Sequence, residues 1–173
     1  QWPAYEILPD SAWNMGLILD SSNPAASFDA ICLLACGATT GIAAALWKAK
    51  VEKGSTVAVF GTGMVGLGAL VGAKMQGAEK IIAVDLSADR LELAKRFGAA
   101  HTVVAGDGDP VEQINALTDG FGAEYTFEAT GNVDVMGQAV EATRMGWGMC
   151  TILGVAGRGE QVKITPRFLI TGR

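Results

Sequence analysis

From residue 56 onward, short apolar runs rich in β-branched residues alternate with longer segments whose apolar residues recur at helical spacing. Glycine, proline and aspartate separate the segments, as is typical of turns. The expected strands are residues 56–60, 80–85, 102–104, 125–128 and 149–153, and the expected helices are residues 64–76, 88–97, 110–117 and 134–143. Because nearly continuous apolar strands alternate with helices, the pattern predicts an α/β fold, a doubly wound parallel sheet covered on both faces.

The chain before residue 56 has a weaker pattern. Residues 1–24 contain several prolines, which interrupt any regular element, so we expect irregular structure there. Ser27 is a suitable N-cap for a helix through residue 35, and a second helix is expected over residues 41–50, where two lysines suit its end. The predicted organisation is an irregular segment (1–24), a helical linker (25–55) and a sheet domain (56–173).

Composition excludes some classes of partner. Half of the 173 residues are hydrophobic and 18% are charged, which is enough apolar material for a buried core, and the net charge of −5 argues against nucleic acid. Residues 30–47 and 57–73 are apolar, but small residues and glycines make them poor membrane spans. Three cysteines, with no recognisable signal peptide, indicate a reducing compartment, and we expect the cytoplasm.

The strongest motif is Gly61-Thr62-Gly63-Met64-Val65-Gly66, which follows an apolar strand and begins a helix. In that context Gly61 would allow a sharp turn, and Gly63 would let the backbone approach a pyrophosphate. Gly66 would let the helix pack closely on the strand, and the helix N-terminus would offer free N–H groups to the phosphates. Residues 56–173 are therefore expected to form an NAD-binding Rossmann domain.

Asp85 ends the second apolar run, about 20 residues after the glycine motif. A carboxylate at that position accepts hydrogen bonds from an adenosine ribose and repels a 2′-phosphate, which favours NAD over NADP. Alternatively, Asp85 only begins the turn before the next helix. The preceding glycines favour the cofactor interpretation.

Further motifs extend along the chain. They are Cys32-Leu33-Leu34-Ala35-Cys36-Gly37-Ala38-Thr39-Thr40-Gly41, Glu128-Ala129-Thr130-Gly131-Asn132-Val133, Gly146-Trp147-Gly148 and Thr171-Gly172-Arg173. Together with the glycine motif and Asp85, they resemble the zinc-dependent medium-chain alcohol dehydrogenases, and within them the glutathione-dependent formaldehyde dehydrogenase (S-(hydroxymethyl)glutathione dehydrogenase) class. The resemblance begins near Pro24 and covers the coenzyme domain of that family, without its N-terminal catalytic domain or its last sheet strand.

The resemblance implies roles for individual residues. Cys36 matches a ligand of the catalytic zinc. The positions that match cofactor contacts, in addition to the three glycines, are Thr40, Met64, Val65, Asp85, Leu86, Arg90, Thr130, Asn132, Leu153, Gly154 and Val155. Of these, Thr40, Val65 and residues 153–155 match the nicotinamide end, and Asp85 and Arg90 match the adenosine ribose. Leu86, Thr130 and Asn132 match the adenine-side and phosphate-side loops.

A catalytic zinc of this type has three protein ligands and one open position. Only Cys36 has a counterpart here, so we expect no stoichiometric zinc in the isolated chain. The resemblance also implies a homodimer formed edge to edge between sheets. Val162, Lys163 and Ile164 alternate as an exposed edge strand would, and we expect them to make that contact.

The resulting hypothesis is the NAD(H)-binding domain of an oxidoreductase. In the complete enzyme, hydride would pass between an alcohol or S-(hydroxymethyl)glutathione and NAD, and zinc would polarise the substrate oxygen. One alternative is a non-catalytic dinucleotide-binding module. Another is an S-adenosylmethionine-dependent enzyme on a similar sheet, which would account for Asp85 but not for Gly66 or the motif around Cys36.

Overall fold

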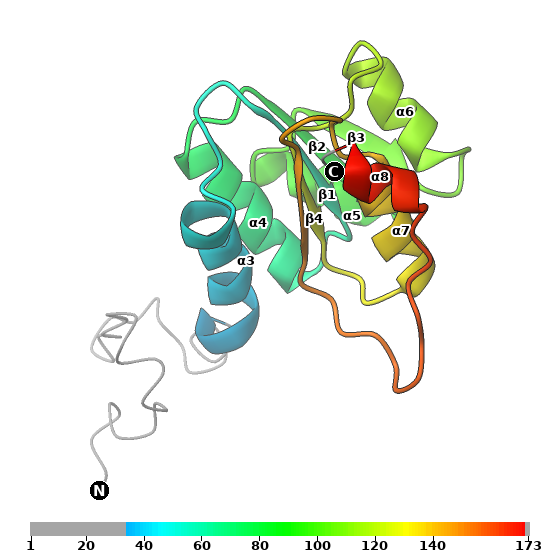
Figure 1. Cartoon of the computed structure of the whole chain (residues 1–173). Helices are drawn as coiled ribbons and strands as arrows, with labels where there is room; N and C mark the ends of the chain where they lie inside the picture. Colours follow the sequence, from blue (N-terminus) through cyan, green and yellow to red (C-terminus); the bar gives the residue numbers. More distant parts are fainter. Residues whose placement is uncertain (1–33, 172–173) are drawn as a thin grey trace, which may run out of the picture.

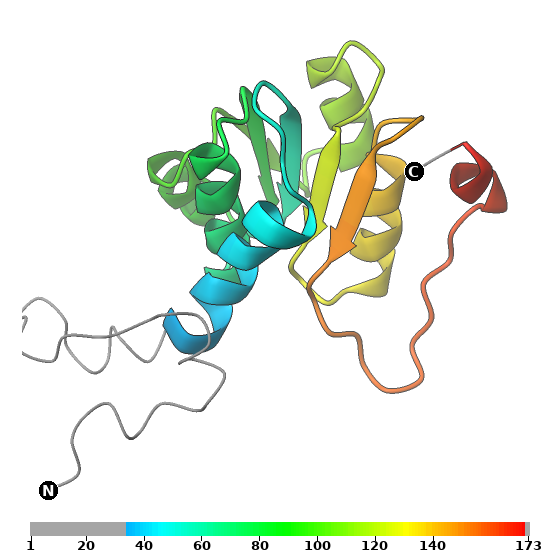
Figure 2. The ribbon, with the colours of Figure 1, turned by 60° about the vertical axis from the view of Figure 1, so that its left-hand side comes forward.

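The computed structural model describes residues 34–171, and within them five parallel strands form one sheet (Figures 1 and 2). The strands are β1 (Thr56–Phe60), β2 (Lys80–Asp85), β3 (His101–Val104), β4 (Tyr125–Glu128) and β5 (Met149–Ile152). Their order across the sheet is β3-β2-β1-β4-β5, so the chain starts in the middle, winds to one edge and then returns to wind to the other. The predicted doubly wound α/β fold is confirmed.

Helices connect the strands on both faces of the sheet. They are α4 (Met64–Met75), α5 (Ala88–Arg96), α6 (Pro110–Leu117) and α7 (Val133–Glu141), and a short α8 (Pro166–Ile170) follows β5. All except α8 were expected, and their ends agree with the sequence pattern to within two residues. Local chemistry explains three of the starts, because the side chains of Ser87, Asp109 and Asn132 accept hydrogen bonds from backbone N–H groups in the first turns of α5, α6 and α7.

The segment before β1 is one continuous helical stretch, formed by η2 (Leu34–Ala38), α3 (Thr39–Ala43) and η3 (Ala44–Lys48), of which η2 and η3 are π-helical. The expected break between residues 35 and 41 is therefore wrong. Packing on α4 explains the difference: a Cβ on Gly41 would lie 2.0 Å from the Val65 carbonyl oxygen, and one on Gly68 would lie 2.6 Å from the Ala38 oxygen. The irregular segment 1–24 and most of the expected helix over 27–35 lie outside the described residues.

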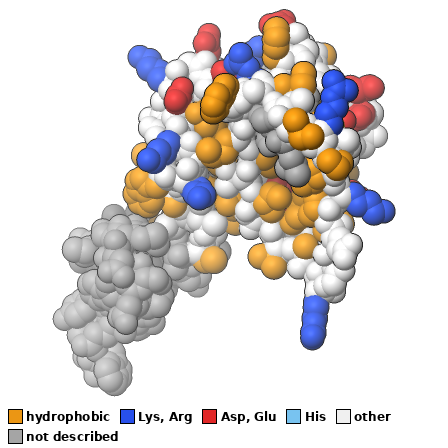
Figure 3. Space-filling model, in the orientation of Figure 1, with side chains coloured by type: hydrophobic (Ala, Val, Ile, Leu, Met, Phe, Trp, Pro, Cys, Tyr) orange, Lys and Arg blue, Asp and Glu red, His pale blue; other side chains and the backbone are white. Residues whose placement is uncertain are grey.

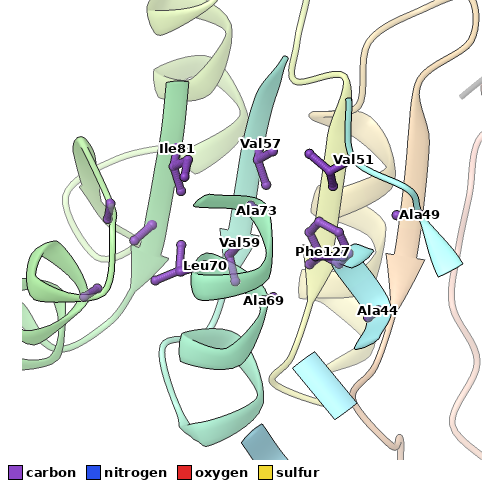
Figure 4. Close-up of a cluster of buried hydrophobic side chains, with 14 of the residues drawn as sticks. Ala44, Ala49, Val51, Val57, Val59, Ala69, Leu70, Ala73, Ile81 and Phe127 are labelled. Atoms are coloured by element: carbon purple, nitrogen blue, oxygen red, sulfur yellow. The ribbon is translucent and has the colours of Figure 1, made fainter. Parts of the chain in front are cut away.

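The core has two halves, one on each face of the sheet. Val57 and Val59 of β1 point toward the side of α4 and α5, and Ala58 and Phe60 point toward the side of α6 and α7. Figure 4 shows the first half, where Phe127 of β4 lies in the same cluster. The central strands are thus buried on both sides, as the continuous apolar runs predict.

The last strand in the sheet order is β5, and its end residues Met149 and Ile152 are exposed. Residues 161–165 form no strand, so the expected edge strand at Val162, Lys163 and Ile164 is wrong. This segment instead leaves the sheet and lines a hollow beside α7 before α8 begins. Hydrophobic side chains gather near the middle of the face shown in Figure 3, and charged side chains lie mostly toward its rim. Within residues 34–171, every helix is too short or too polar to cross a bilayer.

Candidate functional site

A cleft of about 430 Å³ lies at the carboxyl ends of the strands. The lining residues come from the last positions of β1 and β2, from the loops after β1 to β4, and from α5 and α7. They are Phe60, Gly61, Gly63, Val84, Asp85, Leu86, Arg90, Ala105, Ala129, Thr130, Asn132, Val135 and Gln138. The two winding directions of the sheet diverge between β1 and β4, and open α/β sheets bind ligands in the crevice at such a point. Seven of the residues predicted from the sequence meet in this cleft.

The glycine turn after β1 has the geometry that its three glycines suggest. Gly61 has a φ of 87°, which favours glycine, and its N–H donates a hydrogen bond to the Val84 carbonyl oxygen (2.7 Å). A Cβ on Gly66 would lie 1.8 Å from the Gly61 oxygen, so α4 packs directly on the turn. A Cβ on Gly63 would meet no atom of the described residues within 4 Å. The space beside Gly63 is therefore open, and a ligand could approach the protein backbone there.

The N-terminus of α4 differs from those of α5, α6 and α7. Its N-cap is Gly63, which has no side chain to accept a hydrogen bond from the first-turn N–H groups. The first N–H groups of any helix have no partner within the helix, and they carry the positive end of its dipole. This helix end is thus available to an anionic ligand.

Asp85 lies at the end of β2, half-buried beside the glycine turn. Its Oδ2 accepts hydrogen bonds from the N–H and the hydroxyl of Thr62 (2.7 Å each), and its Oδ1 accepts one from the Ser87 N–H (3.0 Å). Burial by itself raises the pKa of Asp85, but the bonds from Ser87 and Thr62, aided by the positive charge of Arg90, lower it below 3.8 overall. The group is therefore an ionised acceptor at neutral pH.

Glu128 ends β4 and is completely buried. Its Oε1 accepts hydrogen bonds from the N–H and hydroxyl of Thr130 and from the Gly131 N–H (3.0 Å). Its backbone oxygen accepts bonds from the N–H groups of Leu153 (2.7 Å) and Gly154 (3.1 Å). One residue thus holds both the loop after β4 and the loop after β5.

The residues assigned to the nicotinamide end are less concentrated. Thr40 and Leu153 line an apolar groove of about 560 Å³ between the helical stretch 34–48 and β5. Its other lining residues are Thr39, Ala43, Ala44, Trp47, Lys48 and Thr151. Five of the predicted residues line neither the cleft nor this groove: Met64, Val65, Gly66, Gly154 and Val155. The Val155 side chain is 90% exposed. Gly154 instead packs on the Gly131 backbone, where a Cβ would lie 2.1 Å from the Gly131 nitrogen.

A family model described as "Zinc-binding dehydrogenase" matches residues 64–173, which is more than half of the chain. The chain belongs to this family. It is 49% identical over 152 residues to an alcohol dehydrogenase class-3 of Myxine glutinosa, and 47% identical over 156 residues to an S-(hydroxymethyl)glutathione dehydrogenase of Saccharomyces cerevisiae. Each match covers 87% of this chain but 40% of the relative.

Solved structures agree with this assignment. The benzyl alcohol dehydrogenase from Acinetobacter calcoaceticus superposes with a TM-score of 0.79 at 34% identity, covering 86% of this chain and 40% of that protein. An alcohol dehydrogenase zinc-binding domain protein from Burkholderia ambifaria gives a TM-score of 0.77 at 35% identity, covering 80% and 37%. This zinc-binding dehydrogenase chain thus spans about two fifths of the length of its relatives.

In this zinc-binding dehydrogenase chain, Cys36 lies in η2 and is exposed. Within residues 34–171, histidine, cysteine, aspartate and glutamate side chains nowhere form a group of three that could hold a metal ion. The residues described do not by themselves fit a catalytic zinc, which needs three protein ligands. Cys36 remains a predicted ligand position, and its two partners would have to lie outside the described part.

Sequence reasoning missed several residues of the candidate cleft. Ala105, Val135 and Gln138 line the cleft, yet their side chains are too ordinary to mark them in the sequence. Thr62 holds Asp85 through two hydrogen bonds. Its position inside the glycine motif was visible, but its contact with a residue at the end of the next strand depends on the fold.

Proposed function

We propose that this chain binds NAD(H) as the coenzyme domain of a zinc-type alcohol dehydrogenase. The observation that carries the proposal is the arrangement of Asp85 beside the glycine turn. An ionised acceptor, an open glycine and an uncapped helix end meet in one cleft at the point where the sheet winding diverges. These are the three groups that a dinucleotide needs for its ribose and its pyrophosphate.

In this proposal the N-terminus of α4 and the open position at Gly63 hold the pyrophosphate. Asp85 accepts a hydrogen bond from the adenosine ribose, and Arg90 adds positive charge beside it. Leu86, Thr130 and Asn132 line the cleft on either side of these groups. The nicotinamide end is assigned to Thr40, Val65 and residues 153–155, of which Thr40 and Leu153 share the apolar groove next to β5.

We further propose that the complete enzyme transfers hydride between an alcohol, or S-(hydroxymethyl)glutathione, and NAD. The support is the identity of 45–49% to proteins named class-3 alcohol dehydrogenase or S-(hydroxymethyl)glutathione dehydrogenase. When bound, NAD supplies the ring carbon that exchanges the hydride, and the residues of this chain bind and orient it. For the zinc, the described residues offer one predicted ligand, Cys36. The remaining ligands would come from outside residues 34–171.

Titration with NADH, followed by fluorescence or calorimetry, tests the proposal. We expect the full chain to bind NADH more tightly than NADPH. Asp85→Ala should weaken NADH binding and reduce this preference, because it removes both the ribose acceptor and the charge that repels a 2′-phosphate. Asp89→Ala, which removes an exposed carboxylate on α5, is the matched control and should leave both affinities nearly unchanged.

Two results would contradict the proposal. Binding of S-adenosylmethionine without binding of NADH would favour the methyltransferase-like alternative. Equal effects of Asp85→Ala and Asp89→Ala on NADH affinity would show that Asp85 is not part of the binding site. Turnover of an alcohol with NAD and zinc has to be measured on the complete enzyme, because the coenzyme domain alone and a non-catalytic dinucleotide-binding module would both bind NADH without turnover.

We also propose a homodimer formed edge to edge between sheets, but through a strand other than the one expected at residues 162–164. Residues 161–165 form no strand, and β3 and β5 are the two edge strands of the sheet. We assign the contact to β5, because it is the edge strand that precedes residues 161–165 in the chain. Met149 and Ile152 at its ends are exposed and apolar. A monomer in sedimentation velocity at micromolar concentration would contradict this part.

We also propose a reducing compartment, the cytoplasm, for this protein. The chain has an odd number of cysteines, and Cys36 and Cys150 are both free thiols. Fractionation of the source cells, followed by detection of the chain with an antibody, tests this assignment. Recovery in an oxidising compartment would contradict it.

A further inference from the structure

Thr62 makes an unusual use of its side chain for a residue between two motif glycines. Its side chain is 2% exposed, so the hydroxyl is buried and needs a hydrogen-bond partner within the protein. The hydroxyl donates a hydrogen bond to Asp85 Oδ2 at 2.7 Å, and the Thr62 N–H donates to the same oxygen at 2.7 Å. Both hydrogen bonds cross from the turn after β1 to the end of β2.

The two carboxylate oxygens of Asp85 accept different numbers of hydrogen bonds. Oδ2 receives two donors, both from Thr62. Oδ1 receives one described donor, the Ser87 N–H at 3.0 Å, and so keeps more of its acceptor capacity. With both oxygens held, the carboxylate plane has a fixed orientation in the cleft wall.

The hydroxyl is not needed to form the turn itself. Gly61 supplies the positive φ, and its N–H bond to the Val84 oxygen joins the turn to β2. The Thr62 N–H also reaches Asp85 whatever side chain stands at this position. The hydroxyl is therefore an additional donor whose described partner is the carboxylate.

We propose that the Thr62 hydroxyl is a positioning group that fixes Asp85, so that Oδ1 is presented to a sugar hydroxyl and the cleft discriminates against a 2′-phosphate. The inference rests on the proposed NAD(H)-binding function and adds a specificity-determining residue to it. Thr62 acts through Asp85 and does not itself contact the cofactor. Hydrogen bonds to charged acceptors are the stronger ones, so loss of this bond has a measurable effect.

The test compares Thr62→Val with Thr62→Ser in the full chain. Valine keeps the shape of threonine without the hydroxyl, and serine keeps the hydroxyl. We expect Thr62→Val to weaken NADH binding by roughly tenfold, to change NADPH binding much less, and so to lower the preference for NADH. Thr62→Ser should restore most of the preference. The affinity for the NADH analogue that lacks the adenosine 2′-hydroxyl should be nearly unaffected by Thr62→Val.

A role in the turn alone predicts a different pattern. Distortion of the glycine turn would weaken NADH, NADPH and the 2′-deoxy analogue by the same factor, and that result would overturn the inference. Thermal unfolding of each variant shows whether the fold is retained. If Thr62→Val unfolds, the ratio of NADH to NADPH affinity in Thr62→Ser and Thr62→Ala still decides, because serine should keep the ratio and alanine should lower it.

A double variant separates this inference from the proposed function. In an Asp85→Ala background, Thr62→Val should cause no further loss of NADH affinity, because its partner is already gone. Additive losses would mean that Thr62 acts independently of Asp85. If wild type fails to bind NADH, the proposed function fails. If wild type binds NADH, Asp85→Ala weakens it and Thr62→Val does not, only the inference about Thr62 fails.

Discussion

Gly41 and Val65 are in backbone contact: a Cβ added to Gly41 would lie 2.0 Å from the Val65 carbonyl oxygen and 2.6 Å from the Ala69 nitrogen. Gly41 is in α3 and Val65 is in the first turn of α4. The helical stretch that carries Cys36 therefore lies directly on the helix that begins at the glycine turn. The neighbouring positions Gly68 and Gly72 of α4 continue this close approach.

Gly41→Ala should destabilise the fold, because the added methyl group would have to displace backbone atoms that cannot move separately. We expect a loss of about 2 kcal/mol in the free energy of unfolding, within the range for overpacked cores. Urea unfolding followed by circular dichroism measures it. Gly106→Ala is the control: its Cβ would meet no described atom within 4 Å, and we expect a change below about 0.5 kcal/mol. Equal stability of the two variants would contradict the close packing.

Gly63→Ala and Gly66→Ala should separate binding from folding. The Cβ at Gly63 would enter open space in the cleft, so stability should be retained while NADH affinity falls by roughly tenfold or more, since the methyl group occupies the approach of the pyrophosphate. The Cβ at Gly66 would lie 1.8 Å from the Gly61 oxygen, so this variant should lose stability first. Unfolding curves and NADH titrations on both variants check the contrast, and a loss of stability in Gly63→Ala as large as in Gly66→Ala would refute it.

The stability contributed by Asp85 should depend on pH in the acid range. Its pKa in the folded chain lies below the usual 3.8, so the charged form is favoured by folding. The contribution is fully present above the unfolded pKa and is lost as the pH falls through the lowered folded value. Asp85→Asn should therefore be less stable than wild type at pH 6, and the difference should shrink below about pH 4. Asp119→Asn, an exposed carboxylate, is the control. A difference that stayed constant down to pH 2.5 would count against the assigned bonds.

The cysteines should differ in reactivity. Cys36 is exposed, whereas burial raises the pKa of the Cys150 thiol, with hydrogen bonds from Thr126 and Thr143 opposing the rise. Because the thiolate is the reactive form, iodoacetamide at pH 8 should label Cys36 faster than Cys150. Mass spectrometry of the two peptides from one time course measures both rates. A sample in guanidinium chloride serves as the control, in which the rates should converge.

Zinc content tests the incomplete metal site. Cys36 is one ligand position, and a zinc site needs three protein ligands. We expect far less than one zinc per purified chain by elemental analysis, with Cys36→Ser unchanged from wild type. One zinc per chain that is lost in Cys36→Ser would show that the chain completes the site with ligands beyond the described residues.

Much of the sheet could be predicted from residue order alone. The strands around Val57, Ile82 and Phe127 are short apolar runs bounded by glycine or charged residues, and buried parallel strands require such runs. The glycine turn was predictable because each of its glycines has its own geometric reason. The caps at Asp109 and Asn132, which fix the starts of α6 and α7, were not singled out in the sequence and are findings of the structure.

Other parts could not be predicted because they depend on contacts between distant residues. Residues 36–40 contain glycine and two threonines, which favour a break, and only packing against α4 makes them helical. The segment around Lys163 alternates as a strand would, yet it lies beside α7 instead of on the sheet. The hydrogen bond from the Thr62 hydroxyl to Asp85 joins the turn after β1 to the end of β2, and the sequence indicates neither its length nor which carboxylate oxygen accepts it.

The strand order has a consequence for the time course of folding. β1, β2 and β3 follow one another in sequence, whereas β4 must return to pair with β1, as Val57 pairs with Tyr125. Closing so long a loop costs more chain entropy than pairing adjacent units, so we expect this pairing to form late. The cleft has one wall after β1 and β2 and the other after β4. In an early intermediate, Asp85 and the glycine turn would then be in place while Thr130 and Asn132 are not. The cleft would be complete only after β4 has paired with β1.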